Sequence, residues 1–441
     1  MNDDIPTESE TIAVKRAARV AEKIARSRLR FTPAWWSKTP LEVLLVTVLF
    51  AVNLYLLSPA LGTEAAKTSF SGPVIPLLAN ILKFFGVPFA YAIQHVVVLF
   101  FAFFPVSLYF FIRKIGGRKL AAFLAILFAS LPVSPFAFSR IISAFFGEDS
   151  PHIASLTLIP LALLTQIQFL REGKFINLFF ASLFVALVAL TSPFGFFVLV
   201  AFATVTTFSE MLLGTGRLKI FRFLVIILVA AGLSSFWYNP HFGLALIMGP
   251  VGEEVRETVA RLIPISFFIV PILAAFGFLL FDRRPELQPF FLASFYTIGF
   301  AIIVSVGGGF FPSHPSRYLS EFGISLAFLG GITLTRFMDF LKFNDKVKAL
   351  KLDKPIFVNG FMGGLALALI LAVVMGKSRV ELTKREVLGL WTDVNRGEIW
   401  LQREQFRGVP AYYGYSITGM TIISLGLLGV TTNIRGKNNS A

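Results

Sequence analysis

Four ionisable side chains lie within one short connection between two strongly apolar segments. The connection is Ser139–Ile153, and it holds Arg140, Glu148, Asp149 and His152. Ionisable groups at the end of a lipid-embedded segment are costly unless they are used or well paired. Carboxylates there can act as general bases or hold a divalent cation by oxygen ligation, and arginine offers planar donors to phosphate. The connection is therefore the first candidate site, with Glu148 and Asp149 as its catalytic carboxylates.

Two other connections extend the set of candidates. Glu64 lies just beyond the first apolar segment, whereas His314, Arg317 and Glu321 lie before a late one. An acid and an arginine at the lipid–water boundary are what the handling of a lipid phosphate requires. Against this, Glu64 alone could be a solvated loop residue, and Arg317 could be an interfacial anchor. We select as substrate-binding candidates His152, His314, Arg317 and Arg140.

A structural interpretation of the first connection stands beside the functional one. Arg140 could form an ion pair with Glu148 or Asp149 that only closes the loop. Asp149 or Ser150 could cap the next helix, because Pro151 fits the first helical turn. If a divalent cation such as Mg²⁺ or Mn²⁺ binds here, Asp149 and Glu148 are its expected ligands.

The composition indicates that these residues lie in a protein embedded in a membrane. The chain has 441 residues, of which 56% are hydrophobic, 51 are Phe and only 15% are charged. This composition predicts an all-α polytopic membrane protein. The chain has no cysteine, which excludes disulfides, iron–sulfur clusters, thiolate zinc sites and cysteine nucleophiles. Its net charge of +15 resides in short loops between apolar segments, so it indicates topology rather than a nucleic-acid partner.

About twelve apolar segments are each near the ~20 residues that a bilayer core requires. A break within 176–213 is expected at Thr191–Gly195, because the whole run is too long for one span. Residues 59–92 carry several Pro and Gly residues and predict one or two short surface helices in the first outer loop. The expected spans are 41–58, 93–112, 120–138, 153–170, 176–191, 194–213, 223–247, 263–281, 289–308, 318–335, 356–376 and 417–434.

The distribution of Lys and Arg predicts the orientation of these spans. Most basic residues lie in the leader and in alternate loops, which predicts that both termini are cytoplasmic and that the chain is a multi-pass protein of the plasma membrane. Three parts are expected. They are a basic leader at 1–40, a transmembrane core at 41–335, and a C-terminal pair of spans at 336–441 around a mixed-charge outer segment, 377–416.

Several short stretches resemble the GT-C superfamily of membrane glycosyltransferases. The first outer loop carries an acidic residue, and the order Ser139-Arg140…Gly147-Glu148-Asp149 is distantly similar to a loop of oligosaccharyltransferase catalytic subunits. Pro315-Ser316-Arg317-Tyr318-Leu319, at the start of a late span, resembles GT-C-like proteins more broadly. No WWD-type motif follows the last span, so transfer to protein sequons is not expected.

The resemblance implies transfer of a sugar from a polyprenyl-phosphate donor on the outer face of the membrane. In that reading Glu64 is the base, Glu148 and Asp149 assist it or hold a cation, and Arg317 contacts the phosphate. The lipid bilayer and the donor are then the partners, and no nucleic acid is expected. A transporter or flippase for a lipid-linked substrate and a non-catalytic GT-C-like protein are the alternatives. The sugar, the acceptor and the oligomeric state stay open.

Overall fold

The computed structural model describes most of the apolar core of the chain. It covers residues 40–61, 72–115, 118–146, 149–213, 216–240, 285–306, 315–340 and 409–438, with single positions between 248 and 275 and at 367. Every regular element within these ranges is helical, and none is a strand. The elements are α3 (Pro40–Leu56), α4 (Ser58–Leu61), α5 (Val74–Phe84), α6 (Phe89–Lys114), α7 (Lys119–Ala129), α8 (Ala137–Ile141), the π-type turn η1 (Ile142–Phe146), α9 (Ser150–Glu172), α10 (Phe175–Thr191), α11 (Pro193–Leu212), α12 (Gly216–Ser234), the 3₁₀ turn η3 (Pro285–Leu287), α15 (Gln288–Val306), the 3₁₀ turn η4 (Pro315–Tyr318), α16 (Leu319–Phe340) and α20 (Val409–Asn438).

Six helices in the described part of the chain are long and apolar enough to cross a membrane. They begin at Phe89, Ser150, Pro193, Gln288, Pro315 and Tyr412. Four shorter apolar helices accompany them, namely Val43–Leu56, Val74–Phe84, Lys119–Ala129 and Phe175–Thr191. The chain is therefore a helical membrane protein, as its composition predicts. The expected number of twelve spans is not confirmed, because the spans expected at 263–281 and 356–376 lie almost wholly outside the described residues.

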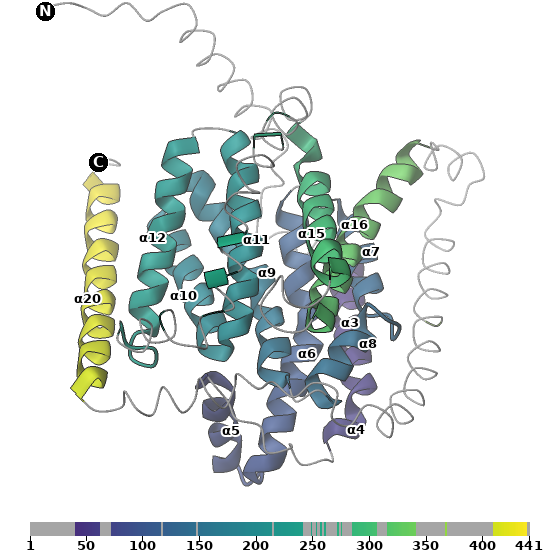
Figure 1. The fold of residues 1–441 in the computed structure, drawn as a ribbon, viewed down its shortest axis with the longest axis horizontal. Helices are drawn as coiled ribbons and strands as arrows, with labels where there is room; N and C mark the ends of the chain where they lie inside the picture. Colours follow the sequence, from purple (N-terminus) through teal and green to yellow (C-terminus); the bar gives the residue numbers. More distant parts are fainter. Residues whose placement is uncertain are drawn as a thin grey trace, which may run out of the picture.

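Helix α9 lies at the centre of the bundle and is the most deeply buried of the six spans (Figure 1). It packs against α6, α10, α11 and α12, while α16 packs against α7 and α15. α20 stands at the edge of the bundle beside α12 and is mostly exposed (Figure 1). A helix that is apolar on all sides belongs in such a central position, because each face meets another helix.

The predicted break between α10 and α11 is confirmed. α10 ends at Thr191, Ser192 is extended, and α11 begins at Pro193. The Ser192 hydroxyl accepts a hydrogen bond from the Gly195 N–H at 3.1 Å. Pro193 gives up no helical hydrogen bond at this position, since the first N–H groups of a helix lack intrahelical acceptors.

The span expected at 120–138 is wrong in its extent. α7 ends at Ala129, and a turn over Leu131–Phe136 separates it from α8. Pro132 and Pro135 explain this difference, because proline lacks an N–H donor and disfavours helix in the residue before it.

Two other expected boundaries also differ from the structure. α12 begins at Gly216 rather than 223, because Lys219 and Arg222 find partners within the bundle and so continue the helix. α20 begins at Val409, so the last residues of the expected outer segment 377–416 are already helical. The expected short helices of the first outer loop are represented by α4 and α5.

Close approach of α16 to α7 and α8 depends on two glycines. A Cβ on Gly323 would collide with the backbone carbonyl of Pro135. A Cβ on Gly331 would lie 2.6 Å from the Ala121 carbonyl oxygen and 2.7 Å from the Ala125 nitrogen. Small residues are common where membrane helices bring their backbones together, and here Gly323 does so near the start of α16 and Gly331 near its middle.

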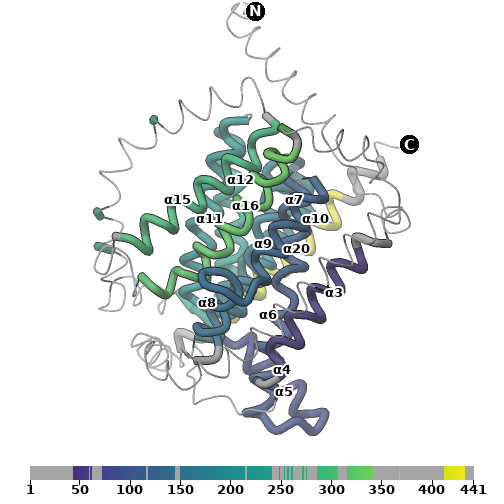
Figure 2. Tube along the Cα trace, turned by 90° about the vertical axis from the view of Figure 1, so that its right-hand side faces the viewer, coloured from purple at the N-terminus to yellow at the C-terminus, as the bar shows by residue number. Residues whose placement is uncertain are grey.

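Elements from separate parts of the sequence gather at one end of the bundle. In both views α4 and α5 lie at the lower end, and α8 lies toward it (Figure 2). The first turns of α9 and α16 lie at this end too, because α9 follows η1 directly and α16 packs against α8. We call it the outer end, after the orientation that the basic residues predict, and the opposite end the inner end.

Candidate functional site

The site is built on the first turns of α9 and α16. Asp149 occupies the N-cap position of α9, and its backbone N–H donates to the Ser143 carbonyl at 2.9 Å, which ties it to η1. Pro151 takes its place in the first helical turn. Arg317 lies in η4 immediately before α16. Residues separated by more than 160 positions in the sequence thus face each other at the outer end.

Asp149 and Arg317 form a two-pronged ion pair. Arg317 Nε donates to Asp149 Oδ2 at 2.7 Å, and Nη2 donates to Oδ1 at 2.9 Å. The Asp149 side chain is only 7% exposed, and the Arg317 side chain only 9%. The Asp149 carboxylate therefore serves Arg317 and makes no cap hydrogen bond to its own helix. The interpretation in which Arg140 pairs with Asp149 is wrong.

Phe194 supports both halves of the site. The guanidinium carbon of Arg317 lies 3.7 Å from the centre of the Phe194 ring, which is a cation–π distance. His152 meets the same ring edge-on, at 4.7 Å between ring centres. Tyr318 packs against it from a third side, at 5.2 Å. Phe194 comes from the first turn of α11, so the helical break at Pro193 places this ring within the site.

His152 and Glu321 meet with no exposed surface. His152 Nε2 lies 2.6 Å from Glu321 Oε1, and both side chains are 0% exposed. This distance is short enough for one proton to lie between the two atoms. Neither His152 Nδ1 nor Glu321 Oε2 has a hydrogen-bond partner among the described residues. The contact is therefore an acid–base pair with unused hydrogen-bonding capacity on both sides.

Arg140 lies apart from these pairs and is fully buried. Its guanidinium carbon lies 4.5 Å from the Phe101 ring centre and 4.1 Å from that of Phe104. Nη2 donates to the carbonyl of Ala129 at 2.6 Å, so Arg140 caps the last turn of α7. Burial lowers the pKa of Arg140 to about 9, and the group stays charged at neutral pH. These contacts give it a structural role.

Three of the candidate residues lie outside the described residues: Glu64, Glu148 and His314. No group of three or more His, Cys, Asp or Glu side chains within the described part could hold a metal ion. Both carboxylate oxygens of Asp149 are taken by Arg317, so Asp149 does not fit the expected role of metal ligand in this arrangement. We therefore derive no step through a divalent cation.

The sequence selected both members of the Asp149–Arg317 pair but only His152 of the His152–Glu321 pair. Glu321 stood among the outer ionisable residues but was not selected, although its position four residues after Arg317 places both near one face of a helix. Phe194 was missed, because Pro193–Phe194 indicated only a break between spans. An aromatic residue directly after that break is the signal that could have identified it.

A second buried polar cluster lies at the inner end and joins four helices. Glu210 of α11 accepts hydrogen bonds from Arg171 of α9 at 2.7 and 2.9 Å and from Gln288 of α15 at 2.7 Å. Lys219 of α12 donates to the same carboxylate at 3.1 Å and also to the Glu210 carbonyl. Arg171 further donates to the Gln288 side-chain oxygen at 2.8 Å. Two cations thus share the Glu210 carboxylate, and both of its oxygens have hydrogen-bond partners, in contrast to those of Glu321.

Comparison with known proteins gives one partial match. Residues 72–259 match a family model described as 6-pyruvoyl-tetrahydropterin synthase related domain; membrane protein. The match covers less than half of the chain and includes α5 to α12, and thus Asp149 and His152 but neither Arg317 nor Glu321. No curated protein and no solved structure matches the chain significantly. The words "membrane protein" in this description agree with the helices that can span a bilayer.

Proposed function

We propose that this chain is a membrane glycosyltransferase of GT-C type that uses a polyprenyl-phosphate-linked sugar donor at the outer end of the bundle. The observation that carries the proposal is the fixed orientation of Arg317. Asp149 holds two of its donor groups and Phe194 supports its flat face, so the guanidinium is held in position before any ligand arrives. Preorganised arginine is well suited to a phosphate that gains charge as the sugar leaves.

The proposed reaction transfers a glycosyl group to an acceptor hydroxyl or amide. The acceptor attacks the anomeric carbon, the bond from that carbon to the phosphate oxygen breaks, and polyprenyl phosphate leaves with the electron pair. Glu64 or Glu148 takes the acceptor proton, and Arg317 stabilises the phosphate. Because Asp149 is engaged by Arg317, its proposed role changes from a catalytic carboxylate to the group that orients the arginine. His314 remains a proposed contact to the donor, whereas the His152 side chain has no exposed surface in this arrangement and would act on the donor only through its neighbours.

An apolar groove between α6 and α9 supports a substrate with a hydrocarbon chain. Its volume is about 350 Å³, and its lining includes Leu99, Phe103 and Leu161. The hydroxyl groups in this lining are turned away, since Thr157 donates to the Phe100 carbonyl at 2.7 Å and Ser107 donates within its own helix. The groove equally suits a flippase for a lipid-linked substrate, which is the second candidate function.

The test is sugar transfer by the full chain in liposomes that contain a radiolabelled polyprenyl-phosphate sugar. We expect Arg317→Lys to weaken donor binding by at least tenfold, because lysine keeps the charge but loses the planar fork. Glu148→Gln together with Asp149→Asn is expected to abolish transfer without loss of membrane insertion. Arg336→Lys, at the far end of α16, is the matched control and should leave transfer unchanged.

Two results would contradict the proposal. Unchanged transfer in the Glu148→Gln, Asp149→Asn protein would exclude both carboxylates from the reaction. Movement of the labelled lipid between leaflets without any covalent product would favour the flippase instead.

A further inference from the structure

Buried polar atoms without a hydrogen-bond partner are concentrated around one contact between α9 and α16. Among the described residues they include both ring nitrogens of His152, both carboxylate oxygens of Glu321, and the hydroxyl oxygens of Ser320 and Ser325. These side chains are 5% exposed or less. A buried polar group with no partner carries a free-energy cost and requires an explanation, such as a bound water, ion or proton.

Among the described residues, the charges around Glu321 do not balance it. Arg317 is engaged by Asp149, and these two cancel each other. The other described groups that pack near the pair, Phe194 of α11 and Tyr318 of η4, carry no charge at neutral pH. An ionised carboxylate in such a place is strongly disfavoured unless it is paired or neutralised. His152, at 2.6 Å, is the group that can neutralise it, and it does so only when the pair holds a proton.

We propose that His152 and Glu321 form a buried proton-binding site. With its proton bound, the pair is either an imidazolium beside a carboxylate or a neutral imidazole beside a carboxylic acid. Its net charge is zero in both forms. The ligand is the proton itself, shared between the imidazole nitrogen and the carboxylate oxygen. Loss of this proton leaves one negative charge between α9 and α16 and weakens the contact between their first turns.

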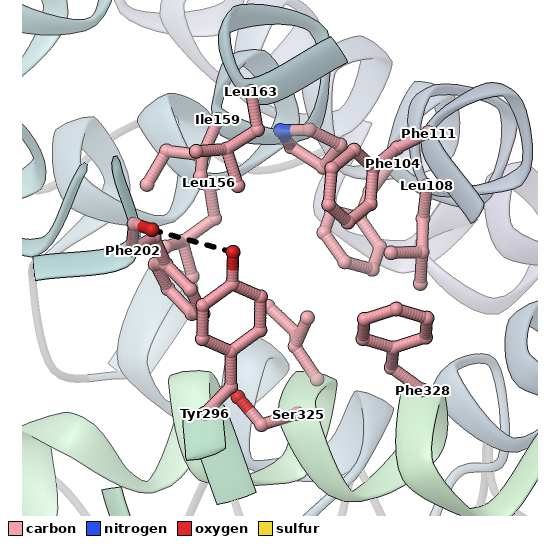
Figure 3. A pocket seen from close by; sticks show the side chains of 12 residues that line it. Phe104, Leu108, Phe111, Leu156, Ile159, Leu163, Phe202, Tyr296, Ser325 and Phe328 are labelled. Atoms are coloured by element: carbon pink, nitrogen blue, oxygen red, sulfur yellow. Dashed lines mark hydrogen bonds between the residues drawn. The ribbon is translucent and has the colours of Figure 1, made fainter. Parts of the chain in front are cut away.

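A small cavity lies one helical turn further into the bundle. It has a volume of about 20 Å³, and Leu156 and Ser325 line it, each four residues after one member of the pair. This volume is enough for one water molecule. Figure 3 shows the Tyr296 and Ser325 side chains at its wall, with the Tyr296 hydroxyl donating to the Phe202 carbonyl at 3.3 Å. The Tyr296 hydroxyl also meets Thr206 Oγ1 at 2.5 Å, whereas the Ser325 hydroxyl, one turn after Glu321, has no hydrogen-bond partner among the described residues.

Phe194 couples the proton site to Arg317. The same ring lies 3.7 Å from the Arg317 guanidinium and 4.7 Å from the His152 ring centre. Asp149 and His152 also share one turn of α9, and Arg317 and Glu321 share the start of α16. A change of charge on the pair therefore changes the surroundings of Arg317 without direct contact between the two.

The experiment uses infrared difference spectra of the full chain in lipid vesicles, recorded at a series of buffer pH values. We expect a pH-dependent signal from a buried carboxyl group that is absent from Glu321→Gln. Glu172→Gln is the matched control, because Glu172 is a partly exposed carboxylate with its own partner, Lys174. The control should retain the signal in full. Equal spectra for the wild-type protein and Glu321→Gln would overturn the proposal.

A second measurement does not depend on the folding of the Glu321 variant. The chain has only four histidines, so wild-type protein labelled with ¹⁵N-histidine gives few ring signals in solid-state NMR. The His152 signals, assigned by their loss in His152→Gln, should show a proton shared with a carboxylate and should change in Ser325→Ala. A His152 ring that stays neutral at every pH, with no response to Ser325→Ala, would refute the site. Neither readout requires sugar transfer, so failure of the proposed function would leave this test intact.

Discussion

At the scale of single residues, the Asp149–Arg317 pair offers the sharpest test of what holds the outer end together. Removal of one partner from a buried ion pair leaves an uncompensated charge and typically costs about 3–5 kcal/mol. We expect Asp149→Leu and Arg317→Met each to lower the free energy of unfolding by an amount in this range. The double variant should lose less than either single variant, since no charge is then left unpaired.

Chemical unfolding of the purified protein in detergent measures this cycle. The coupling energy between the two positions is obtained from the two single variants and the double variant. Additive losses would contradict the pairing that the distances of 2.7 and 2.9 Å describe.

The sequence identified most of the ionisable residues at the outer end, but it did not show which of them form pairs. Ionisable residues are rare in apolar surroundings, so Asp149, His152 and Arg317 could be selected from residue type and position alone. Which acid meets which base depends on the distance and rotation between α9 and α16, and no local pattern encodes these. The same limit explains Arg140, whose neighbours Phe101 and Phe104 are indistinguishable in sequence from the many other phenylalanines of the chain.

At the scale of elements, Gly331 determines how closely α16 approaches α7. A Cβ at this position would lie 2.6–2.8 Å from three atoms of Ala121 and Ala125, two of which belong to the backbone. We expect Gly331→Ala to lower the free energy of unfolding by about 1–3 kcal/mol, as overpacking of a tight contact does. Thermal unfolding in detergent or nanodiscs measures the change.

Gly299 of α15 provides the matched control. A Cβ there would meet nothing within 4 Å, so Gly299→Ala should be neutral or stabilise the helix by up to about 1 kcal/mol. Equal losses at the two positions would show that the close contacts of Gly331 do not determine the effect of the substitution there.

Helix boundaries were predictable where the chain itself interrupts the helix. The Ser192–Pro193 break followed from local chemistry, since proline opens a helix and serine caps it. The early start of α12 was not predictable, because Lys219 and Arg222 continue the helix only with partners on other helices. Lys219 reaches the Glu210 carboxylate at 3.1 Å, and Arg222 reaches the Leu170 carbonyl at 2.8 Å.

At the scale of the whole molecule, the absence of cysteine makes the predicted orientation directly testable. Phe85 follows α5 at the outer end and is 75% exposed, whereas Lys174 lies between α9 and α10 at the inner end with a side chain that is 68% exposed. A membrane-impermeant thiol reagent applied to intact cells should label Phe85→Cys and spare Lys174→Cys. Permeabilised cells should show labelling of both.

The reverse pattern would place the carboxylate and arginine site on the cytoplasmic side. A donor used on the outer face could then not reach Arg317, and the proposed function would fail with it. The class of the whole molecule, a helical membrane protein, followed from composition alone, because 56% hydrophobic residues with few charges are typical of chains that span a membrane by helices.

Helix α9 carries a buried ionic cluster near each end, and the separation of the two clusters has a consequence for the surrounding lipid. From His152 to Arg171 the helix rises by roughly 28 Å at ~1.5 Å per residue, close to the ~30 Å hydrocarbon thickness of a typical bilayer. Because α9 runs through the bundle from one cluster to the other, their separation indicates the thickness of the membrane in which the whole bundle fits. In a markedly thicker bilayer one cluster would be drawn below the headgroups, and in a thinner one apolar surface would meet water. The acyl-chain length of the host lipid thus becomes a variable that acts on both ends of the bundle at once.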